Sequence, residues 1–433
     1  MADRGHIVVG SDRSFDVNPA HPVYQLLKLK NITIVPQDGS GIDRSFDLAV
    51  FSTAVEADNP EMLKAKNLGI VVETRPEYLA KIVTEFKTIA VAGTSGKSTT
   101  AGMLAFFMKQ LGMKPNFIGG GRVKQFKTDR NAGNAITGDS ELLVIEACES
   151  DGTIVNYKPE HSIILNLELD HHSVGETAAM FKTLCENTSG MIVLNADDVH
   201  LNKIPLENTV CFSIDAASKY RAENVDLQPF STGFSVNGTR FRLFIPGKYN
   251  VYNALSCIAL LGEMGISHKN IADVLTEFNG IERRFDIHLN DGKRFVIDDY
   301  AHNPHKIASF MMTMQDVRKR ICYIFQPHGF APTRNMKAGY IETFAEYLRD
   351  SDHLILLPIY YAGGTATKDI SSNDLAVGIR DHGKSVEVVE SRGNILSRPG
   401  KWDSYAILGA RDETLADFAR DLAQKLKQSG NHA

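Results

Sequence analysis

A short glycine-rich turn carries the clearest chemical signal in the sequence. The turn reads GTSGKST; it follows an apolar run over residues 88–92 and precedes an apolar-striped stretch of helix length. Its glycines allow backbone N–H groups to turn inward around phosphate oxygens, and the positive end of the following helix adds to the attraction. The lysine can reach the β and γ phosphates of a nucleotide, and the serine after it can ligate Mg²⁺. The candidate ATP-binding residues are Gly93, Thr94, Ser95, Gly96, Lys97, Ser98 and Thr99.

Acidic and imidazole side chains follow two other apolar runs. Glu146 ends the run over residues 142–146, and His171 comes shortly after the run over 162–166. Parallel α/β sheets bind ligands at the carboxyl ends of their strands, so we expect both groups near the phosphates. Together with Ser98 they form the predicted Mg²⁺ site. The structural alternatives are a strand–turn–helix with an incidental lysine and a surface turn around the histidine.

Short β-branched runs alternate with helix-length amphipathic segments along nearly the whole chain. This pattern predicts an α/β protein with mainly parallel sheets. We expect three domains: a Rossmann-like N-terminal domain over residues 1–86, a central domain with a P-loop ATPase-type parallel sheet over 87–288, and a C-terminal Rossmann-like domain over 289–433. The expected strands are 6–9, 32–35, 48–52, 69–72, 88–92, 142–146, 162–166, 191–195, 294–297, 321–325, 354–357, 386–389 and 405–408, and the chain is expected to close on a helix over 414–427.

Composition and charge exclude several classes of function. The 433 residues carry 47 Lys and Arg against 52 Asp and Glu, a formal net charge of −5, so no global basic field attracts nucleic acid or an anionic membrane. Five dispersed cysteines without a C-x-x-C pair are typical of reduced thiols. No run approaches the roughly 18 apolar residues of a membrane span. We expect a cytoplasmic protein that binds small molecules, with its oligomeric state left open.

Further motifs, in order along nearly the whole chain, resemble those of a known family. The family is the Mur ligases, the ATP-dependent amide ligases of peptidoglycan assembly. The motifs that carry the resemblance are Gly10-Ser11-Asp12, Ser52-Thr53-Ala54-Val55, Asn59-Pro60-Glu61, the phosphate loop, and residues 118–120, 146–151, 166–171, 247–254, 283–285, 298–304 and 325–328.

The resemblance implies a reaction and a set of site residues. ATP would phosphorylate a UDP-N-acetylmuramate-type carboxylate, and the amino group of an amino acid, L-alanine in the leading interpretation, would attack the acyl phosphate. Lys97 and Mg²⁺ would stabilise charge on the phosphoryl oxygens. Asn250 and Asn253 would lie near the adenine, and Arg284 would contact phosphate. The implied catalytic groups are Lys97, His302, His328 and Arg334, and the implied substrate groups are Ser11, Asp12, Ser52, Thr53, Asp299 and Tyr300.

Several of these residues also have structural interpretations. Asn250 and Asn253 would then cap the start of a helix, and Arg284 would pair with a nearby surface carboxylate. Tyr300 and His328 would be hydrogen-bonded groups at strand ends. The family resemblance favours the functional interpretation.

The sequence departs from the family pattern at three places. The chain opens directly on the strand before Gly10, without a glycine-rich loop for a diphosphate, so we expect a truncated N-terminal domain and leave open whether the substrate is UDP-linked. Both arginines expected in the amino-acid pocket are displaced, and Arg334 is the candidate carboxylate clamp. Lys182 lies where several Mur ligases carry a carbamylated lysine; a lysine on a solvated helix face is favoured here.

Two other functions stay open at this point. The altered amino-acid pocket equally fits another amino acid or a peptide, such as the recycled tripeptide that a related ligase attaches. A nucleotide-binding regulatory protein without ligase activity would also tolerate the displaced arginines. The complete set of Lys97, Ser98, Glu146 and His171 argues against this second alternative.

Overall fold

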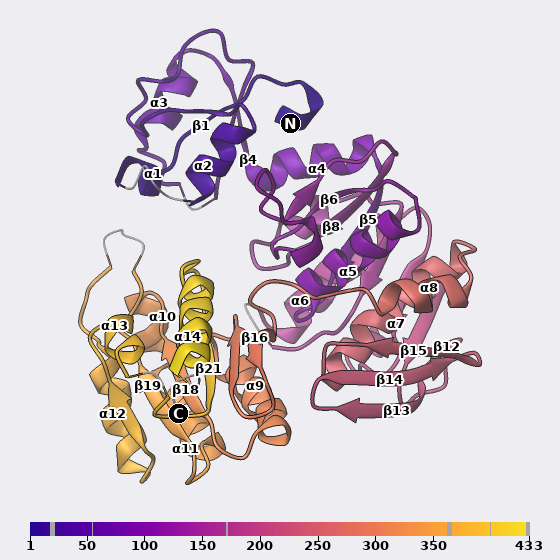
Figure 1. The fold of residues 1–433 in the computed structure, drawn as a ribbon. Coiled ribbons are helices and arrows are strands. Elements are labelled where there is room, and N and C mark those ends of the chain that lie inside the picture. The colour runs from indigo at the N-terminus through magenta and orange to yellow at the C-terminus, as the bar shows by residue number, and fades with distance from the viewer. Residues whose placement is uncertain (18–21, 54, 170–171, 362–365, 399, 430–433) are drawn as a thin grey trace. The chain divides into compact units, whose positions relative to one another are not determined.

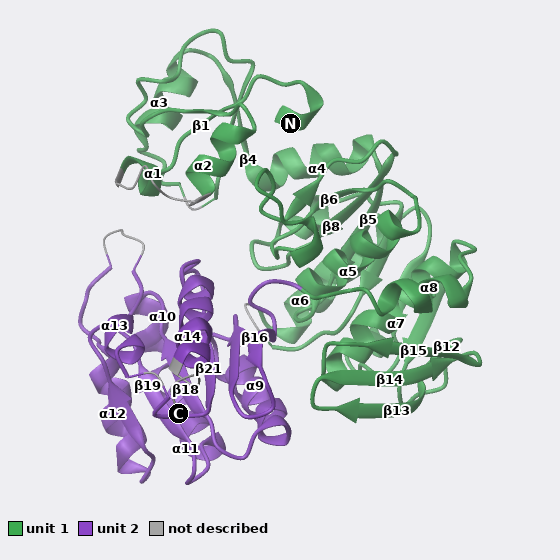
Figure 2. Ribbon diagram, viewed as in Figure 1, with its two compact units in different colours: residues 1–280 green, residues 281–433 purple. Residues whose placement is uncertain are grey.

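The computed structural model describes residues 1–17, 22–53, 55–169, 172–361, 366–398 and 400–429. The chain divides into two compact units, residues 1–280 and 281–433 (Figure 2). No helix within the described ranges is long and apolar enough to cross a membrane. Short 3-10 helices occur at Ala2–Arg4, Lys124–Phe126, Thr153–Asn156 and Leu201–Lys203.

The first 86 residues contain two parallel strand pairs with helices between the strands (Figure 1). The paired strands are β1 (Val9–Gly10) with β2 (Thr33–Ile34) and β3 (Leu48–Phe51) with β4 (Val71–Thr74). The helices are α1 (Arg13–Val17), α2 (Pro22–Leu29), α3 (Pro60–Asn67) and α4 (Arg75–Glu85). A capping box formed by Thr74 and Glu77 satisfies two backbone N–H donors at the N-terminus of α4. The strand–helix alternation follows the prediction, but the strands are shorter than expected.

An eight-stranded sheet forms the middle of the first unit. Its order is β12-β11-β10-β9-β5-β8-β6-β7, and every neighbouring pair is parallel except β6 with β7. The strand β5 is central and buried from Thr88 to Ala92, as its continuous apolar sequence predicts for a strand covered on both faces. The strands are β5 (Lys87–Ala92), β6 (Asn116–Ile118), β7 (Ala135–Ile136), β8 (Leu142–Glu146), β9 (His161–Ile164), β10 (Ile192–Asn195), β11 (Thr209–Ser213) and β12 (Tyr220–Arg221).

Helices and a small antiparallel sheet complete this unit. The helices are α5 (Lys97–Gln110), α6 (Val174–Glu186), α7 (Lys248–Glu263) and α8 (His268–Leu275). The antiparallel sheet consists of β13 (Glu223–Gln228), β14 (Ser231–Val236) and β15 (Thr239–Leu243). The turn between β14 and β15 is Asn237-Gly238, both with positive φ, which matches the twist of a tight hairpin. None of these three strands was predicted from the sequence.

The second unit is built on a six-stranded sheet in the order β16-β17-β21-β18-β19-β20. Only β16 runs antiparallel to its neighbour. The strands are β16 (Asp286–Asn290), β17 (Phe295–Asp299), β18 (Cys322–Gln326), β19 (His353–Leu356), β20 (Val386–Val388) and β21 (Ser404–Gly409). The helices are α9 (Pro304–Val317), α10 (Phe330–Asn335), α11 (Lys337–Tyr347), α12 (Ser372–Asp381), α13 (Arg392–Leu396) and α14 (Leu415–Ser429). Since β16 pairs within this sheet, the sheet begins before residue 289.

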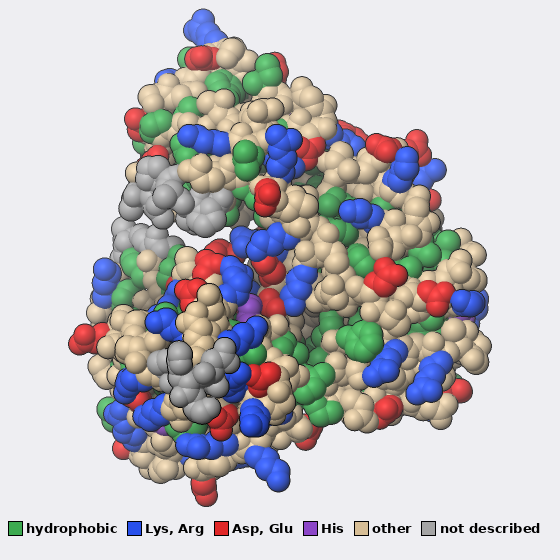
Figure 3. Space-filling model, viewed as in Figure 1, with side chains coloured by type: hydrophobic (Ala, Val, Ile, Leu, Met, Phe, Trp, Pro, Cys, Tyr) green, Lys and Arg blue, Asp and Glu red, His purple; other side chains and the backbone are tan. Residues whose placement is uncertain are grey.

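Acidic and basic side chains are interspersed over the face of the molecule that Figure 3 shows. This mixture agrees with the small formal net charge of −5. Attraction of an anionic ligand therefore depends on local groups rather than on a field of one sign.

Candidate active site

The phosphate loop joins β5 to α5 and takes a shape that requires glycine. Gly96 has φ +85°, and a β-carbon there would lie 2.5 Å from Oδ1 of Asn253. The loop therefore approaches the start of α7 closely. Thr99 lies in the first turn of α5, whose N-terminal end faces the loop.

Asn166, just beyond β9, holds the loop in place. Its Oδ1 accepts hydrogen bonds from Thr94 Oγ1 and from the backbone amide of Ser95, both at 2.8 Å, and its Nδ2 donates to the Ser95 carbonyl at 3.0 Å. Three hydrogen bonds from one side chain fix two loop residues. Asn166 belongs to the motif over residues 166–171, but no local sequence pattern predicts this role.

Lys97 reaches back over the loop to two acceptors. Its Nζ donates to the Gly93 carbonyl at 2.6 Å and lies 2.8 and 3.1 Å from the two carboxylate oxygens of Glu149. Only 2% of the Glu149 side chain is exposed, so this is a buried ion pair. Glu149 belongs to the motif over residues 146–151, but nothing local in the sequence identifies its partner, which is 52 residues away.

The predicted magnesium ligands Ser98 and Glu146 lie together. Ser98 Oγ donates to Glu146 Oε1 at 2.9 Å, and the backbone amide of Gly120 donates to Oε2 at 2.8 Å. A hydroxyl and a carboxylate at a phosphate loop are hard oxygen ligands of the kind Mg²⁺ prefers, so these residues fit the ion. His171, the third predicted ligand, lies outside the described residues.

Asn250 and Asn253 are both buried in the first turns of α7. The Asn253 Nδ2 donates to Asn250 Oδ1 at 3.0 Å, and the Asn250 Nδ2 donates to the Pro246 carbonyl at 2.7 Å. Neither side chain caps the helix, whose N-cap residue is Gly247. The close approach of Asn253 to Gly96 sets this pair beside the phosphate loop.

In the second unit, Arg284 lies in a tight turn before β16. The residues on either side of it, Arg283 and Phe285, have positive φ values of 59° and 48°. Left-handed backbone at non-glycine residues is unfavourable and is kept only where surrounding contacts enforce it. The turn brings the Arg284 guanidinium to 4.8 Å from the ring centre of Tyr300.

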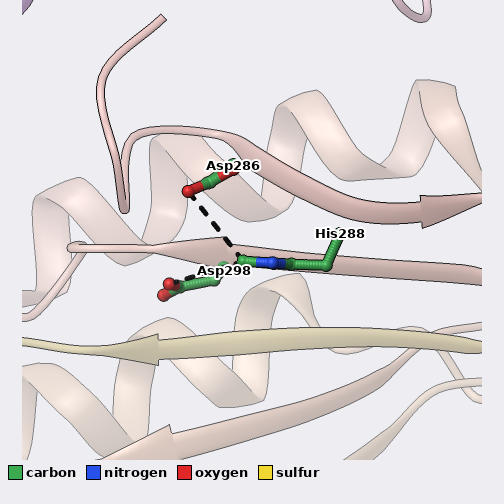
Figure 4. Close-up of side chains that lie close together, drawn as sticks. All are labelled: Asp286, His288 and Asp298. Carbon is green, nitrogen blue, oxygen red and sulfur yellow. Dashed lines mark ion pairs between the residues drawn. The ribbon is translucent and has the colours of Figure 1, made fainter. Parts of the chain in front are cut away.

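A buried ionic cluster around Arg283 enforces that turn, and Figure 4 shows its other members, Asp286, His288 and Asp298. The Arg283 Nε lies 3.1 Å from Asp298 Oδ1, and its terminal nitrogens donate to the carbonyls of Gly409 and Asp412. Asp298 is directly opposite Asp286 in the β16–β17 pair, and His288 Nε2 lies 3.8–3.9 Å from a carboxylate oxygen of each. Like charges across two strands repel, so the guanidinium is the cation that makes this arrangement possible.

Two imidazoles meet at the carboxyl end of this sheet. The ring centres of His302 and His328 are 5.2 Å apart in an edge-to-face arrangement, and the ring centre of Tyr300 lies 5.5 Å from that of His302. Burial lowers the pKa of His302 and of His328 to about 4, so both are neutral at pH 7. The buried Nδ1 of His328 has no hydrogen-bond partner among the described residues. Neutral imidazoles with a free ring nitrogen can accept or relay a proton.

Asp299 binds backbone amides and supports the same loop. Its Oδ2 accepts from the amide of Phe285 at 2.7 Å and its Oδ1 from the amide of Ala301 at 2.8 Å. Burial raises the pKa of this carboxyl, although the Arg284 charge opposes the effect. Asp299 therefore links the turn that carries Arg284 to the loop that carries Tyr300.

Arg334, the candidate carboxylate clamp, already has an anionic partner. Its guanidinium forms an ion pair with Asp369, with Nε 3.0 Å from Oδ1, and it also donates to the Thr367 carbonyl. The structure does not bring it into the cluster of Tyr300, His302 and His328.

A hollow of about 320 Å³ opens at the carboxyl ends of β18, β19 and β21. Gln326, Tyr360, Arg392 and Asp412 are among its lining residues. Arg392 is bound to Asp412 and donates to Gln326 at 2.8 Å. The hollow adjoins His328, because the residues 328 and 360 form a parallel bridge.

The predicted substrate residues of the first domain lie near two of its strand ends. Ser11 follows β1, and its Oγ donates to Glu61 at 2.6 Å; Asp12 accepts the backbone amide of Ser14. Ser52 and Thr53 are exposed just after β3. These groups bind neighbours or face solvent, and their relation to substrate stays a prediction.

Lys182 lies on an exposed face of α6. It is 3.5 Å from Glu186 in an i,i+4 pair, and 47% of its side chain is exposed. Lys182 therefore has the environment of an ordinary surface lysine.

The fold and the phosphate loop define a nucleotide-binding α/β enzyme. Family models match three consecutive parts of the chain: the Mur ligase family catalytic domain over residues 1–87, the Mur ligase middle domain over 91–261, and the Mur ligase glutamate ligase domain over 283–401. The chain belongs to the Mur ligase family, and it has the three-domain fold and the ATP-dependent ligase class of that family.

Individual relatives agree with this assignment. The chain is 30% identical over 434 residues to the UDP-N-acetylmuramate–L-alanine ligase of Caldicellulosiruptor saccharolyticus, covering 95% of this chain and 92% of that one. It is 32% identical to the ligase of the same name from Thermosynechococcus vestitus, covering 95% and 89%. Among solved structures, the UDP-N-acetylmuramate-alanine ligase of Thermotoga maritima matches with a TM-score of 0.80 and 25% identity, over 99% of this chain and 95% of that chain.

Proposed function

We propose that the protein joins the carboxylate of UDP-N-acetylmuramate to L-alanine at the expense of ATP, in the cytoplasmic steps of peptidoglycan synthesis. The observation that carries the proposal is the match over 95% of the chain to ligases of that name. Five free cysteines are consistent with a reducing compartment.

The phosphate loop supplies the activating half of the reaction. Lys97 and the loop amides bind the ATP phosphates, and the Lys97 charge stabilises the γ-phosphoryl group as it passes to the substrate carboxylate. Asn166 keeps the loop amides oriented before the nucleotide arrives. Asn250 and Asn253 lie on α7 beside the phosphate loop, where they would contact the nucleotide near its adenine.

Ser98 and Glu146 are the residues that would hold Mg²⁺, together with His171. The ion, when bound, would neutralise charge on the phosphate oxygens. Ser98 Oγ lies 2.9 Å from Glu146 Oε1, and a bound ion would replace this hydrogen bond between the two ligands.

The second unit supplies the groups for amide formation. The amine of the acceptor attacks the acyl phosphate carbon, the phosphate leaves with its electron pair, and the amine loses a proton. His302 and His328 are neutral at pH 7 and are the proposed proton acceptors. Arg284 and Tyr300 would contact the transferred phosphate and the reacting carboxylate.

Phosphate release from ATP tests the proposal directly. Purified protein is assayed with Mg²⁺ over UDP-linked and unlinked N-acetylmuramate, each with L-alanine, other amino acids or the L-alanyl-γ-D-glutamyl-diaminopimelate tripeptide. We expect release to depend on both UDP-N-acetylmuramate and L-alanine, with ligated product found by mass spectrometry. Release that depends on the tripeptide would assign the peptide-ligase alternative, and no acceptor-dependent release would refute the proposal.

Two lysine variants complete the assay: Lys97→Ala tests the phosphate loop, and Lys182→Ala is its matched control. Lys97→Ala should abolish acceptor-dependent release, whereas Lys182→Ala on the exposed face of α6 should leave the rate within about twofold.

A further inference from the structure

Arg411 lies two residues beyond the carboxyl end of β21. That strand is between β17 and β18 in the sheet, and its last residue, Gly409, is in register with Gln326 of β18. The backbone amide of Arg411 donates to the Tyr300 hydroxyl at 3.2 Å. Arg411 is therefore tied to the loop that carries Tyr300, on the strand next to the one that leads to His328.

The backbone of Arg411 adopts a conformation that a glycine would adopt more easily. Its φ is +62°, in the left-handed region where a β-carbon crowds the carbonyl oxygen. The side chain is exposed, and its guanidinium forms no hydrogen bond or ion pair with the described residues. The guanidinium makes no hydrogen bond or ion pair with the described residues that would offset this strain, which points to a ligand as its partner.

The other arginines near this end of the sheet are already engaged. Arg334 is paired with Asp369, Arg392 with Asp412, and Arg283 with the buried Asp298. Arg284 lies over the Tyr300 ring, and the proposed function assigns its guanidinium to the transferred phosphate. Arg411 is the guanidinium in this part of the described structure that is left for a carboxylate.

The position of Arg411 relative to the imidazoles suits an amino acid. Its positive charge acts on His328 and adds to the effect of burial in keeping that ring neutral. An amino acid carries its carboxylate one carbon from its amine, so a carboxylate bound at a cation beside two neutral imidazoles brings the amine toward them. Guanidinium groups bind carboxylates with two parallel hydrogen bonds, which fixes orientation as well as position.

We propose that Arg411 binds the carboxylate of the incoming amino acid and thereby directs its amine toward His302 and His328. This inference rests on the proposed ligase function and makes one part of it specific. The acceptor must have a free carboxylate next to its amine, and Arg411 replaces Arg334 as the group that recognises it.

The test compares L-alanine with L-alaninamide, which lacks the carboxylate. The variants are Arg411→Gly, Arg411→Lys and, as the matched control, Arg334→Ala. Arg411→Gly removes the guanidinium while easing the backbone strain, so it should fold. The readouts are kcat and KM for the acceptor, the KM for ATP, and the ratio of kcat/KM for alanine to that for alaninamide.

We expect Arg411→Gly to raise the KM for L-alanine by about 10-fold or more, because a charge-assisted hydrogen-bonded contact with the carboxylate is lost. The KM for ATP should stay within about twofold of the wild-type value. The preference for alanine over alaninamide should fall by a similar factor, and Arg411→Lys should lie between the two. Arg334→Ala should keep the wild-type preference. An unchanged preference in Arg411→Gly, or its loss in Arg334→Ala, would overturn the inference.

Direct binding separates this inference from the ligase proposal. Saturation-transfer NMR on the alanine methyl group, with wild-type protein and Arg411→Gly, needs no turnover. A signal in the wild type that Arg411→Gly abolishes supports Arg411 even if no ligation occurs. Turnover with alanine but equal NMR signals in both proteins refutes Arg411 alone, and neither signal nor turnover in the wild type refutes both.

Discussion

His302 and His328 are two titratable side chains that the fold keeps neutral. Both have a pKa of about 4, against about 6.5 for an unperturbed histidine. The cause is burial in each case, with nearby cations adding to it. The neutral form is the one that can take a proton from an amine at pH 7.

The same shift makes the stability of the protein depend on pH. Between about pH 6.5 and 4 the unfolded chain binds protons that the folded imidazoles do not, so stability falls as the pH falls through this window and is unaffected by these groups above it. At about pH 4.5, His328 alone should account for a loss of about 2–3 kcal/mol relative to pH 7. Urea unfolding of wild type and His328→Asn at both pH values measures it. The variant should lose less stability than the wild type; an equal loss would contradict the prediction.

Asn166 should matter for nucleotide binding more than for folding. Replacing it by alanine removes three hydrogen bonds to the phosphate loop and frees the amide of Ser95. We expect Asn166→Ala to raise the KM for ATP by about 10-fold. Each of the three hydrogen bonds contributes about 1 kcal/mol, and we expect only part of this total to appear as weaker nucleotide binding. Asn202→Ala, which removes an exposed asparagine bonded to the Ala196 carbonyl, is the control and should leave the KM for ATP unchanged. An unaltered KM in Asn166→Ala would show that the loop holds its shape without this side chain.

At the scale of elements, the ends of β17, β18 and β21 together carry the second group of site residues. Register places Asp299 of β17 against Leu408 of β21 and Gln326 of β18 against Gly409. The loops after these strands therefore begin level with one another, as expected at the carboxyl edge of a parallel sheet. The buried Arg283 ties the turn before β16 to the end of β21.

Arg283 should be important for stability. Arg283→Met would leave Asp298, which is fully buried, without its cation, and removing one partner of a buried pair typically costs about 3–5 kcal/mol. Chemical denaturation followed by Trp402 fluorescence measures the change within the same unit. Arg420→Met, which breaks an exposed pair with Asp417, should cost at most about 1 kcal/mol. Equal losses in the two variants would contradict a special role for the buried cluster.

Local features of these elements were predictable from the sequence. The phosphate loop, its strand and Glu146 at a strand end follow from short patterns whose meaning depends on neighbouring residues, and the structure places Ser98 and Glu146 together. The hairpin at Asn237-Gly238, which was not predicted, also has a local signal, a turn dipeptide between alternating apolar residues.

Features that depend on distant residues were not predictable. The partner of Lys97 is 52 residues away, and the engagement of Arg334 by Asp369 spans 35 residues. The strand order places β21 between β17 and β18, although it comes last along the chain. Arg411 became a candidate only through that order and through its backbone conformation, neither of which a single sequence reveals. The roles of the individual site residues and the domain boundaries at 86 and 288 stay predictions.

At the scale of the whole molecule, each compact unit has its own buried core. One core lies around Phe181 and Ile145 in residues 1–280, and another around Ile324 and Phe418 in residues 281–433. The single tryptophan of the chain, Trp402, packs against the second core and stacks on His353. Its fluorescence therefore reports on the second unit, whereas circular dichroism reports on both.

This arrangement predicts two unfolding transitions. Since the phosphate loop belongs to the first unit, a non-hydrolysable ATP analogue with Mg²⁺ should raise the midpoint of the transition seen by circular dichroism alone. At 100 times its Kd, a ligand adds about 2.7 kcal/mol to the unit that binds it. The Trp402 transition should stay in place. If both probes shift together, the chain unfolds as one cooperative body.

The buried pair of Lys97 and Glu149 has one more consequence. The phosphate loop carries its own counter-ion, so its lysine is already satisfied before any nucleotide arrives. A ligand binds there only if it offers more negative charge, in a better geometry, than a single carboxylate does. Polyphosphates meet that condition and isolated carboxylates do not. Glu149 therefore prevents the carboxylate of the acid substrate from binding to Lys97, and the lysine binds the triphosphate instead.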